Sequence, residues 1–145
     1  MLASSLSHNG YTNVGKKYLM PVHQLEHALS GKFIHVAHAC GLAILFPGWA
    51  DKYYRYDVDK FARLGNYLFN IDDKNKEEAA KKCINAFREY FKKLGMPSRL
   101  SEVGVKKEDI EELANLISQN KTRSIPHHAQ PLGYEEAKEI LMKVL

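Results

Sequence analysis

Four of the chain's seven histidines stand in the stretch HQLEHALSGKFIHVAH, at positions 23, 27, 35 and 38. Histidine is the commonest metal ligand and exchanges protons near neutral pH. Residues four apart lie above one another on a helix, so His23 and His27 can reach one ion, as the paired histidines of some zinc sites do. His35 and His38, three apart, can pair in the same way. The spacing permits a metal site, and it equally permits histidines that bond to backbone carbonyls in a core.

The acidic residues around these histidines limit the kind of metal site. In the HExxH motif of metalloproteases the acid directly follows the first histidine, whereas Glu26 stands three residues after His23. A metalloprotease is therefore excluded. No aspartate of the chain is followed by a histidine four residues later. A catalytic metal usually needs three protein ligands and an open position, and spacing alone leaves open whether this chain supplies them.

The apolar periodicity around these histidines is helical. Pro21 suits a first helical turn and the Ser-Gly pair at 30–31 suits a stop, which predicts a helix that carries the first two histidines. A second helix is predicted from about Val36 to the region of Tyr53, with a kink at Pro47 because proline lacks a backbone donor.

The rest of the chain continues the same pattern. Asp57 is predicted to cap a third helix, and Asn75 with Glu78 resembles a capping box at the start of a long fourth one that ends near Gly95. Helices are also predicted at 107–118 and around Ala137–Val144. No alternating strand pattern of useful length is found. The sequence therefore predicts one all-α domain, a helical bundle over residues 1–145.

Composition and charge exclude several classes of protein. The chain has 145 residues, 45% of them hydrophobic, and its 21 Lys and Arg exceed its 17 Asp and Glu by a net charge of +4. Acids and bases alternate in stretches such as DDKNKEEAAKKC, as on a solvated helix face, so no nucleic-acid partner is expected. Cys40 and Cys83 stand far apart and are expected to be reduced thiols. With no secretory signal and no apolar run long enough for a membrane, a soluble cytoplasmic protein is expected.

The segments LSHNGYTNVGKKYLMPVHQLEHALS and VAHACGLAILFPGWADKYY resemble the C-terminal half of iron-containing alcohol dehydrogenases. The NADPH-dependent butanol dehydrogenase branch is the most similar, and the resemblance continues through KLGMPSRLSEVGVKKEDIEELA to the final PLGYEEAKEIL. It implies the helical, dehydroquinate synthase-like C-terminal fold, and an enzyme that interconverts aldehydes and primary alcohols with NADP(H) or NAD(H).

The resemblance also implies roles for the histidines. It places the metal, Fe²⁺ or in some members Zn²⁺, on His23 and His38, and puts His27 near the substrate as a catalytic residue. His35 falls where the family does not require histidine and is expected to be incidental. His127 and His128, in a polar loop, are expected to be solvated. The family's remaining two ligands, an Asp and a His, have no counterpart in this sequence.

The family's dinucleotide-binding domain has no counterpart either, because the nine glycines are scattered and form no G-x-G-x-x-G. We therefore expect a fragment that is inactive alone and needs that domain as a partner, with a homodimer suggested by the resemblance. Two other hypotheses stay open: a free-standing helical interaction module, and a zinc protein that uses His23 and His27 as a pair. Loss of metal binding on removal of His38 would favour the dehydrogenase fragment over a zinc protein that uses His23 and His27.

Overall fold

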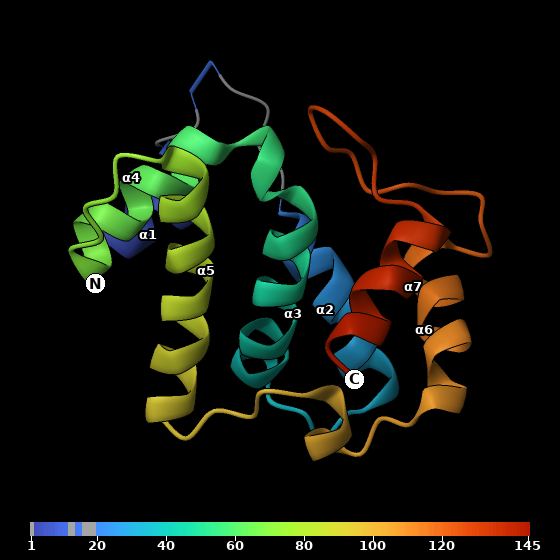
Figure 1. Cartoon of the computed structure of the whole chain (residues 1–145). Coiled ribbons are helices and arrows are strands. Elements are labelled where there is room, and N and C mark those ends of the chain that lie inside the picture. The colour runs from blue at the N-terminus through green and yellow to red at the C-terminus, as the bar shows by residue number, and fades with distance from the viewer. Residues whose placement is uncertain (1, 12–13, 16–19) are drawn as a thin grey trace.

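The computed structural model describes residues 2–11, 14–15 and 20–145, and it has the all-α architecture that the periodicity predicts (Figure 1). In the described residues, extended structure is limited to one antiparallel bridge between Ile125 and Leu132. No helix in that part of the chain has the length and hydropathy that crossing a membrane requires. The α-helices are α1 (Leu2–His8), α2 (Pro21–Lys32), α3 (His38–Tyr53), α4 (Val58–Phe69), α5 (Lys76–Lys93), α6 (Ile110–Ser118) and α7 (Tyr134–Lys143). Three short 3-10 turns complete the order: η2 (Tyr54–Tyr56), η3 (Leu100–Val103) and η4 (Lys107–Asp109).

Most predicted helix boundaries are confirmed to within about two residues. α2 begins at Pro21 as predicted, and α3 continues through Pro47 to Tyr53. The helix predicted from residue 107 begins with the 3-10 turn η4 and becomes α-helical at Ile110. The first helix, α1, was not among the predictions, because its seven residues carry only one pair of leucines at helical spacing, Leu2 and Leu6.

Two apolar clusters form the core. α3, which stands between α5 and α7 in Figure 1, belongs to both. The larger cluster joins α2, α3, α6 and α7 around fully buried leucines such as Leu25, Leu45 and Leu113. The smaller joins α3 to α4 and α5 through Phe61, Ile84 and their neighbours. Trp49, the chain's single tryptophan, packs against both clusters. α3 therefore packs against α2, the helix that carries His23 and His27.

The two predicted N-caps behave differently. The Asn75 side chain accepts hydrogen bonds from the backbone N–H groups of Glu77 and Glu78 at the start of α5, at 3.0 and 3.3 Å. This confirms the cap, although the reciprocal bond of a capping box is replaced by one from Asn75 N to Asp73 Oδ1. Asp57 stands at the N-cap of α4, but the prediction that its side chain caps that helix is wrong. Its carboxylate faces Lys60 and a histidine of a distant loop instead.

We expect Asn75→Ala to lower the free energy of unfolding by about 1 kcal/mol, because two N–H groups of α5 lose their acceptor. Asn75→Asp keeps an acceptor oxygen and adds a negative charge at a helix N-terminus, so its stability is expected to match or exceed that of the wild type. Urea denaturation followed by circular dichroism measures both. Equal stability losses in the two variants would contradict the capping role.

Candidate metal centre

The structure brings three of the four clustered histidines together where α2 meets the start of α3. His23 and His27 lie on α2, and His38 is the first residue of α3. The ring centroids of His23 and His38 are 5.2 Å apart, and the rings of His27 and His38 stack at 5.9 Å. The residues that the resemblance assigns to the metal and to catalysis therefore share one place on the surface.

Beneath these rings lies a carboxylate that the sequence analysis assigned no role. Glu26 is fully buried, and its Oε2 accepts a hydrogen bond from Nδ1 of His38, whose side chain is half exposed. The other oxygen, Oε1, has no partner among the described residues. The carboxylate fits there because residue 41 is glycine: a Cβ on Gly41 would lie 2.7 Å from Glu26 Cγ and 2.8 Å from Oε1.

This pair fixes the chemistry of the His38 ring. When the Glu26 carboxylate accepts this bond, the proton of a neutral His38 ring sits on Nδ1 and the lone pair is on Nε2. Metal-binding histidines almost always donate their other ring N–H to a carboxylate or a carbonyl, which orients the ring and makes it a better donor to the metal. The contact between Glu26 and His38 is of this kind, and it leaves Nε2 as the ligand atom.

The environment of His23 also favours a neutral ring. Burial lowers the pKa of His23 below its ordinary value, and His38 and His27 lower the pKa further because each disfavours another positive charge nearby. Glu26 opposes this shift. A neutral imidazole is the form that binds a metal.

Three other histidines, His35, His127 and His128, lie outside this centre. The Nε2 atom of His35 is 3.1 Å from the carbonyl oxygen of Val103, which agrees with the incidental role expected for that residue. His128 is half exposed, as expected. The expectation that His127 is solvated is wrong, because its ring packs against Tyr53 with centroids 4.5 Å apart.

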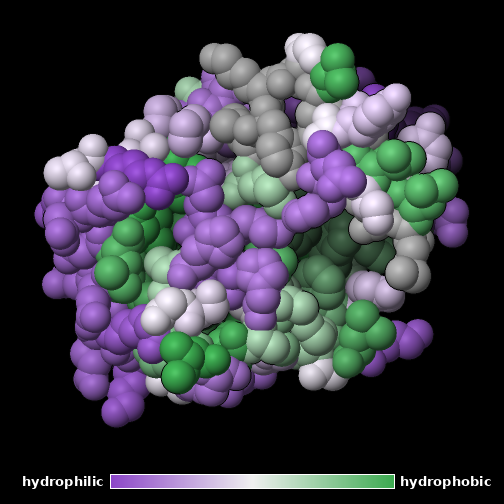
Figure 2. Space-filling view, turned by 180° about the vertical axis from the view of Figure 1, so that it is seen from behind, coloured by the Kyte–Doolittle hydropathy of each residue, from purple (hydrophilic) through white to green (hydrophobic). Residues whose placement is uncertain are grey.

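Two open grooves flank the histidines. One, of ≈ 630 Å³, is lined almost entirely by apolar side chains of α2, α3, α4 and α5, with His23 at its edge. Figure 2, which shows the molecule from behind, displays a hollow of this hydrophobic kind between hydrophilic surfaces. The other groove, of ≈ 710 Å³, is lined by His27, Lys32 and Arg123 among others. The centre thus lies between an apolar and a polar recess.

The donor set fits part of a divalent metal site. His23 and His38 offer two imidazole nitrogen ligands, with a carboxylate behind His38. No set of three or more ligand side chains within 4.8 Å of one another includes these histidines in the part of the chain that the structure describes. Since a catalytic metal normally has at least three protein ligands, these residues form a partial site.

Comparison with known proteins places the chain in a family. The model of the Fe-containing alcohol dehydrogenase family, C-terminal, matches residues 1–145. The NADH-dependent butanol dehydrogenase A of Clostridium acetobutylicum is 38% identical over 99% of this chain, which corresponds to 37% of that protein. The NADPH-dependent butanol dehydrogenase of Clostridium saccharobutylicum is 25% identical over 81% of the chain, so the NADPH-dependent branch predicted from the sequence is only weakly supported.

A solved structure shows the same fold. The crystal structure of NADH-dependent butanol dehydrogenase A from Thermotoga maritima superposes with a TM-score of 0.86 at 30% identity and covers 99% of this chain. The chain in turn spans 37% of the length of that relative. With the helical architecture, the family match and the similarity to butanol dehydrogenases in agreement, the chain belongs to the iron-containing alcohol dehydrogenase family and corresponds to its C-terminal part.

Proposed function

We propose that this chain is the metal-ligating part of an alcohol dehydrogenase that interconverts short aldehydes and primary alcohols with NAD(P)H. The observation that carries the proposal is the hydrogen bond between the buried Glu26 and His38, which prepares Nε2 of His38 as a ligand beside His23, whose pKa is lowered. The similarity to butanol dehydrogenases supports the substrate class.

In this proposal His23 and His38 hold Fe²⁺ or Zn²⁺, and Glu26 orients His38. The bound metal supplies a Lewis acid for the oxygen of the carbonyl or alcohol group. His27 holds and releases the alcohol proton, a role for which histidine is the usual side chain. Its ring stacks on His38 and lines the polar groove, so it lies on the side from which water can exchange that proton.

The apolar groove beside His23 fits the alkyl part of the substrate. Its lining includes Leu42, Phe46 and Phe87, which offer no hydrogen bond to a sugar or an amino acid. An alkyl chain placed there leaves the oxygen-bearing carbon at the histidines. This arrangement favours simple alcohols over polyhydroxylated ones.

We further propose that the remaining metal ligands and the nicotinamide cofactor come from a separate dinucleotide-binding domain. Two histidines bind a metal more weakly than a complete site, and no third ligand atom of the described residues lies within 4.8 Å of both. The chain alone is therefore expected to bind metal weakly and to lack dehydrogenase activity.

An anaerobic titration with Fe²⁺ and with Zn²⁺ tests this proposal. The His23→Ala variant should bind one metal equivalent fewer than the wild type. His35→Ala, a matched control outside the centre, should bind as much metal as the wild type. The titration is then repeated with the dinucleotide-binding domain of the Thermotoga maritima relative. We expect tighter binding and aldehyde-dependent NADH oxidation on mixing only. Unchanged binding in His23→Ala, or no activity in a mixture that does bind metal, would overturn the proposal.

A further inference from the structure

The segment between α6 and α7, residues 119–133, brings two adjacent histidines against the start of α4. The donor atoms of Asp57, His127 and His128 all lie within 4.8 Å of one another. The Nε2 atom of His128 is 3.4 Å from Oδ2 of Asp57. We propose that these three side chains form a second site for a divalent cation, with zinc as the ion that the donors fit best.

The donor types and their spacing suit zinc. Zinc accepts imidazole nitrogen and carboxylate oxygen, and two ligand atoms on a tetrahedral ion are roughly 3.3 Å apart. The separation of 3.4 Å between His128 and Asp57 already matches such an edge. The third donor needs only a small side-chain rotation to close the site, because no pair of donors exceeds 4.8 Å. Three protein ligands leave one position to water.

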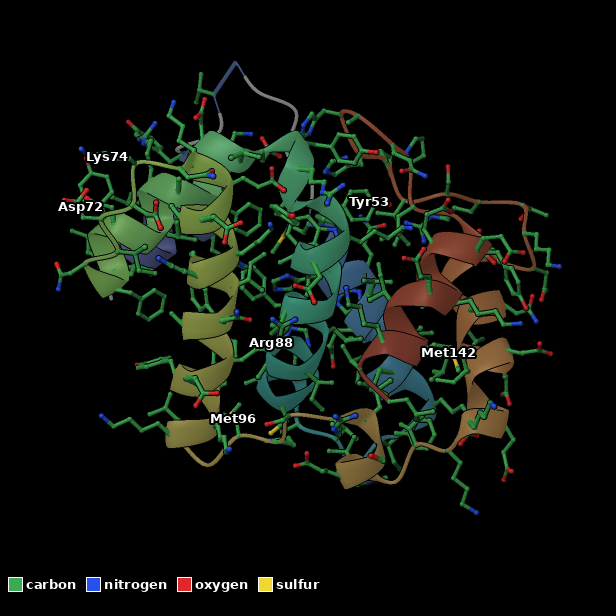
Figure 3. All side chains as sticks on the ribbon, viewed as in Figure 1. Tyr53, Asp72, Lys74, Arg88, Met96 and Met142 are labelled. Atoms are coloured by element: carbon green, nitrogen blue, oxygen red, sulfur yellow. The ribbon has the colours of Figure 1, made fainter. Side chains whose placement is uncertain are left out.

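The surroundings hold His127 in place. Its ring lies 4.5 Å from the ring of Tyr53 and 5.9 Å from that of Tyr56, and Figure 3 shows Tyr53 at the end of α3 beside this segment. The Tyr53 hydroxyl and the Trp49 indole N–H, next to the same ring, have no partner among the described residues. Burial lowers the pKa of His127, and the adjacent His128 lowers it further, so the ring is neutral at pH 7.

Two existing contacts compete with the cation. Lys60 Nζ lies 2.5 Å from Oδ1 of Asp57, but its side chain is 75% exposed and can leave the carboxylate to the ion. Nδ1 of His127 accepts long hydrogen bonds from the backbone N–H groups of Ala129 and Gln130, at 3.3 and 3.5 Å. A cation on Nε2 moves the ring proton to Nδ1 and replaces these two bonds, which are weak at such lengths.

The site would fasten a long connection to the body of the fold. Segment 119–133 begins with three consecutive residues in the left-handed region, Gln119, Asn120 and Lys121. Within the segment, Ile125 and Leu132 form an antiparallel β-bridge. A cation shared by Asp57 and the two histidines adds a link from this segment to the η2–α4 junction. Since the ion binds only the folded arrangement, it stabilises the native state.

The test is the zinc stoichiometry and thermal stability of the full chain, measured in the His38→Ala background so that the first centre is disabled. We expect one zinc equivalent there, and at least about 10-fold weaker binding on adding His128→Ala or Asp57→Asn. Zinc should raise the melting temperature of the background protein and leave that of the His128→Ala variant unchanged.

His35→Ala in the same background is the matched control and should bind zinc like the background protein. All these positions are at least partly exposed, so the variants are expected to fold, which circular dichroism confirms. Equal zinc affinity with and without His128, or binding only at millimolar zinc, would overturn the second site. Neither result bears on the centre formed by His23 and His38, because that centre is absent from the background.

Discussion

Replacing His38 by alanine is expected to abolish metal binding at the His23–His38 centre, and replacing Glu26 by methionine is expected to weaken it by about 10–100-fold. Methionine keeps an unbranched side chain of similar length but removes the acceptor of the His38 Nδ1 proton. The ring is then free to rotate and to exchange tautomers, and it becomes a poorer donor to the metal. Glu26→Gln keeps an acceptor without the charge, so an intermediate affinity is expected.

Stability separates this positioning role from a structural one. Glu26 is a fully buried acid with one unpartnered oxygen, and burying such a group costs free energy that an apolar side chain in its place does not. We therefore expect Glu26→Met to lose metal affinity without losing thermal stability in the metal-free state. The affinities are measured by competition with a chromogenic chelator, in the His128→Ala background.

A double-mutant cycle sharpens the test, since Glu26→Met should have no further effect on metal binding once His38 is alanine. Glu139→Met, which removes an exposed acid paired with Lys52 on the far end of α3, is the matched control and should bind metal normally. Wild-type affinity in Glu26→Met, or an equal loss in the control, would contradict the role of Glu26.

Gly41→Ala is expected to destabilise the protein and to weaken metal binding together. The new methyl group would lie 2.7 Å from Glu26 Cγ, so the buried carboxylate must move away from His38. Overpacking of this kind costs about 1–3 kcal/mol, whereas alanine in place of a helical glycine contributes about 0.5–1 kcal/mol. The net expectation is a loss on the order of 1–2 kcal/mol in the free energy of unfolding.

Gly31→Ala provides the control for that prediction. Gly31 also lies in a helix, α2, but a Cβ there meets no described atom within 4 Å. It should show only the helix-propensity gain and should bind metal like the wild type. Urea denaturation measures the stability of both variants, and metal titration measures their affinity. A Gly41→Ala protein as stable as Gly31→Ala would show that Glu26 has room to move.

The helices were predictable because their signals are local. Apolar residues recurring every three or four positions, Pro21 at a helix start and the cap at Asn75 all act within a few residues of chain. The short helix α1 has a single such pair, Leu2 and Leu6, and no cap signal, and it was missed.

The centre itself was predictable only in part. The family resemblance selected His23 and His38, whereas spacing favoured the pair of His23 and His27 equally. Glu26 was missed because its partner lies on another helix, although a charged residue beside Leu25 in the apolar stripe of α2 is a signal that the sequence does contain. His127 was misjudged because the loop composition around it gives no sign of the packing against Tyr53.

The position of α3 in both apolar clusters determines how metal binding is coupled to unfolding. α3 contributes to both apolar clusters, so neither cluster can unfold cooperatively without exposing one of its faces. Under the proposed function, a metal held by His23 and His38 would link α2 to the first turn of α3. Its binding free energy would then be coupled to global rather than local opening, and metal binding at one edge of the fold would protect the distant α4–α5 pair as well.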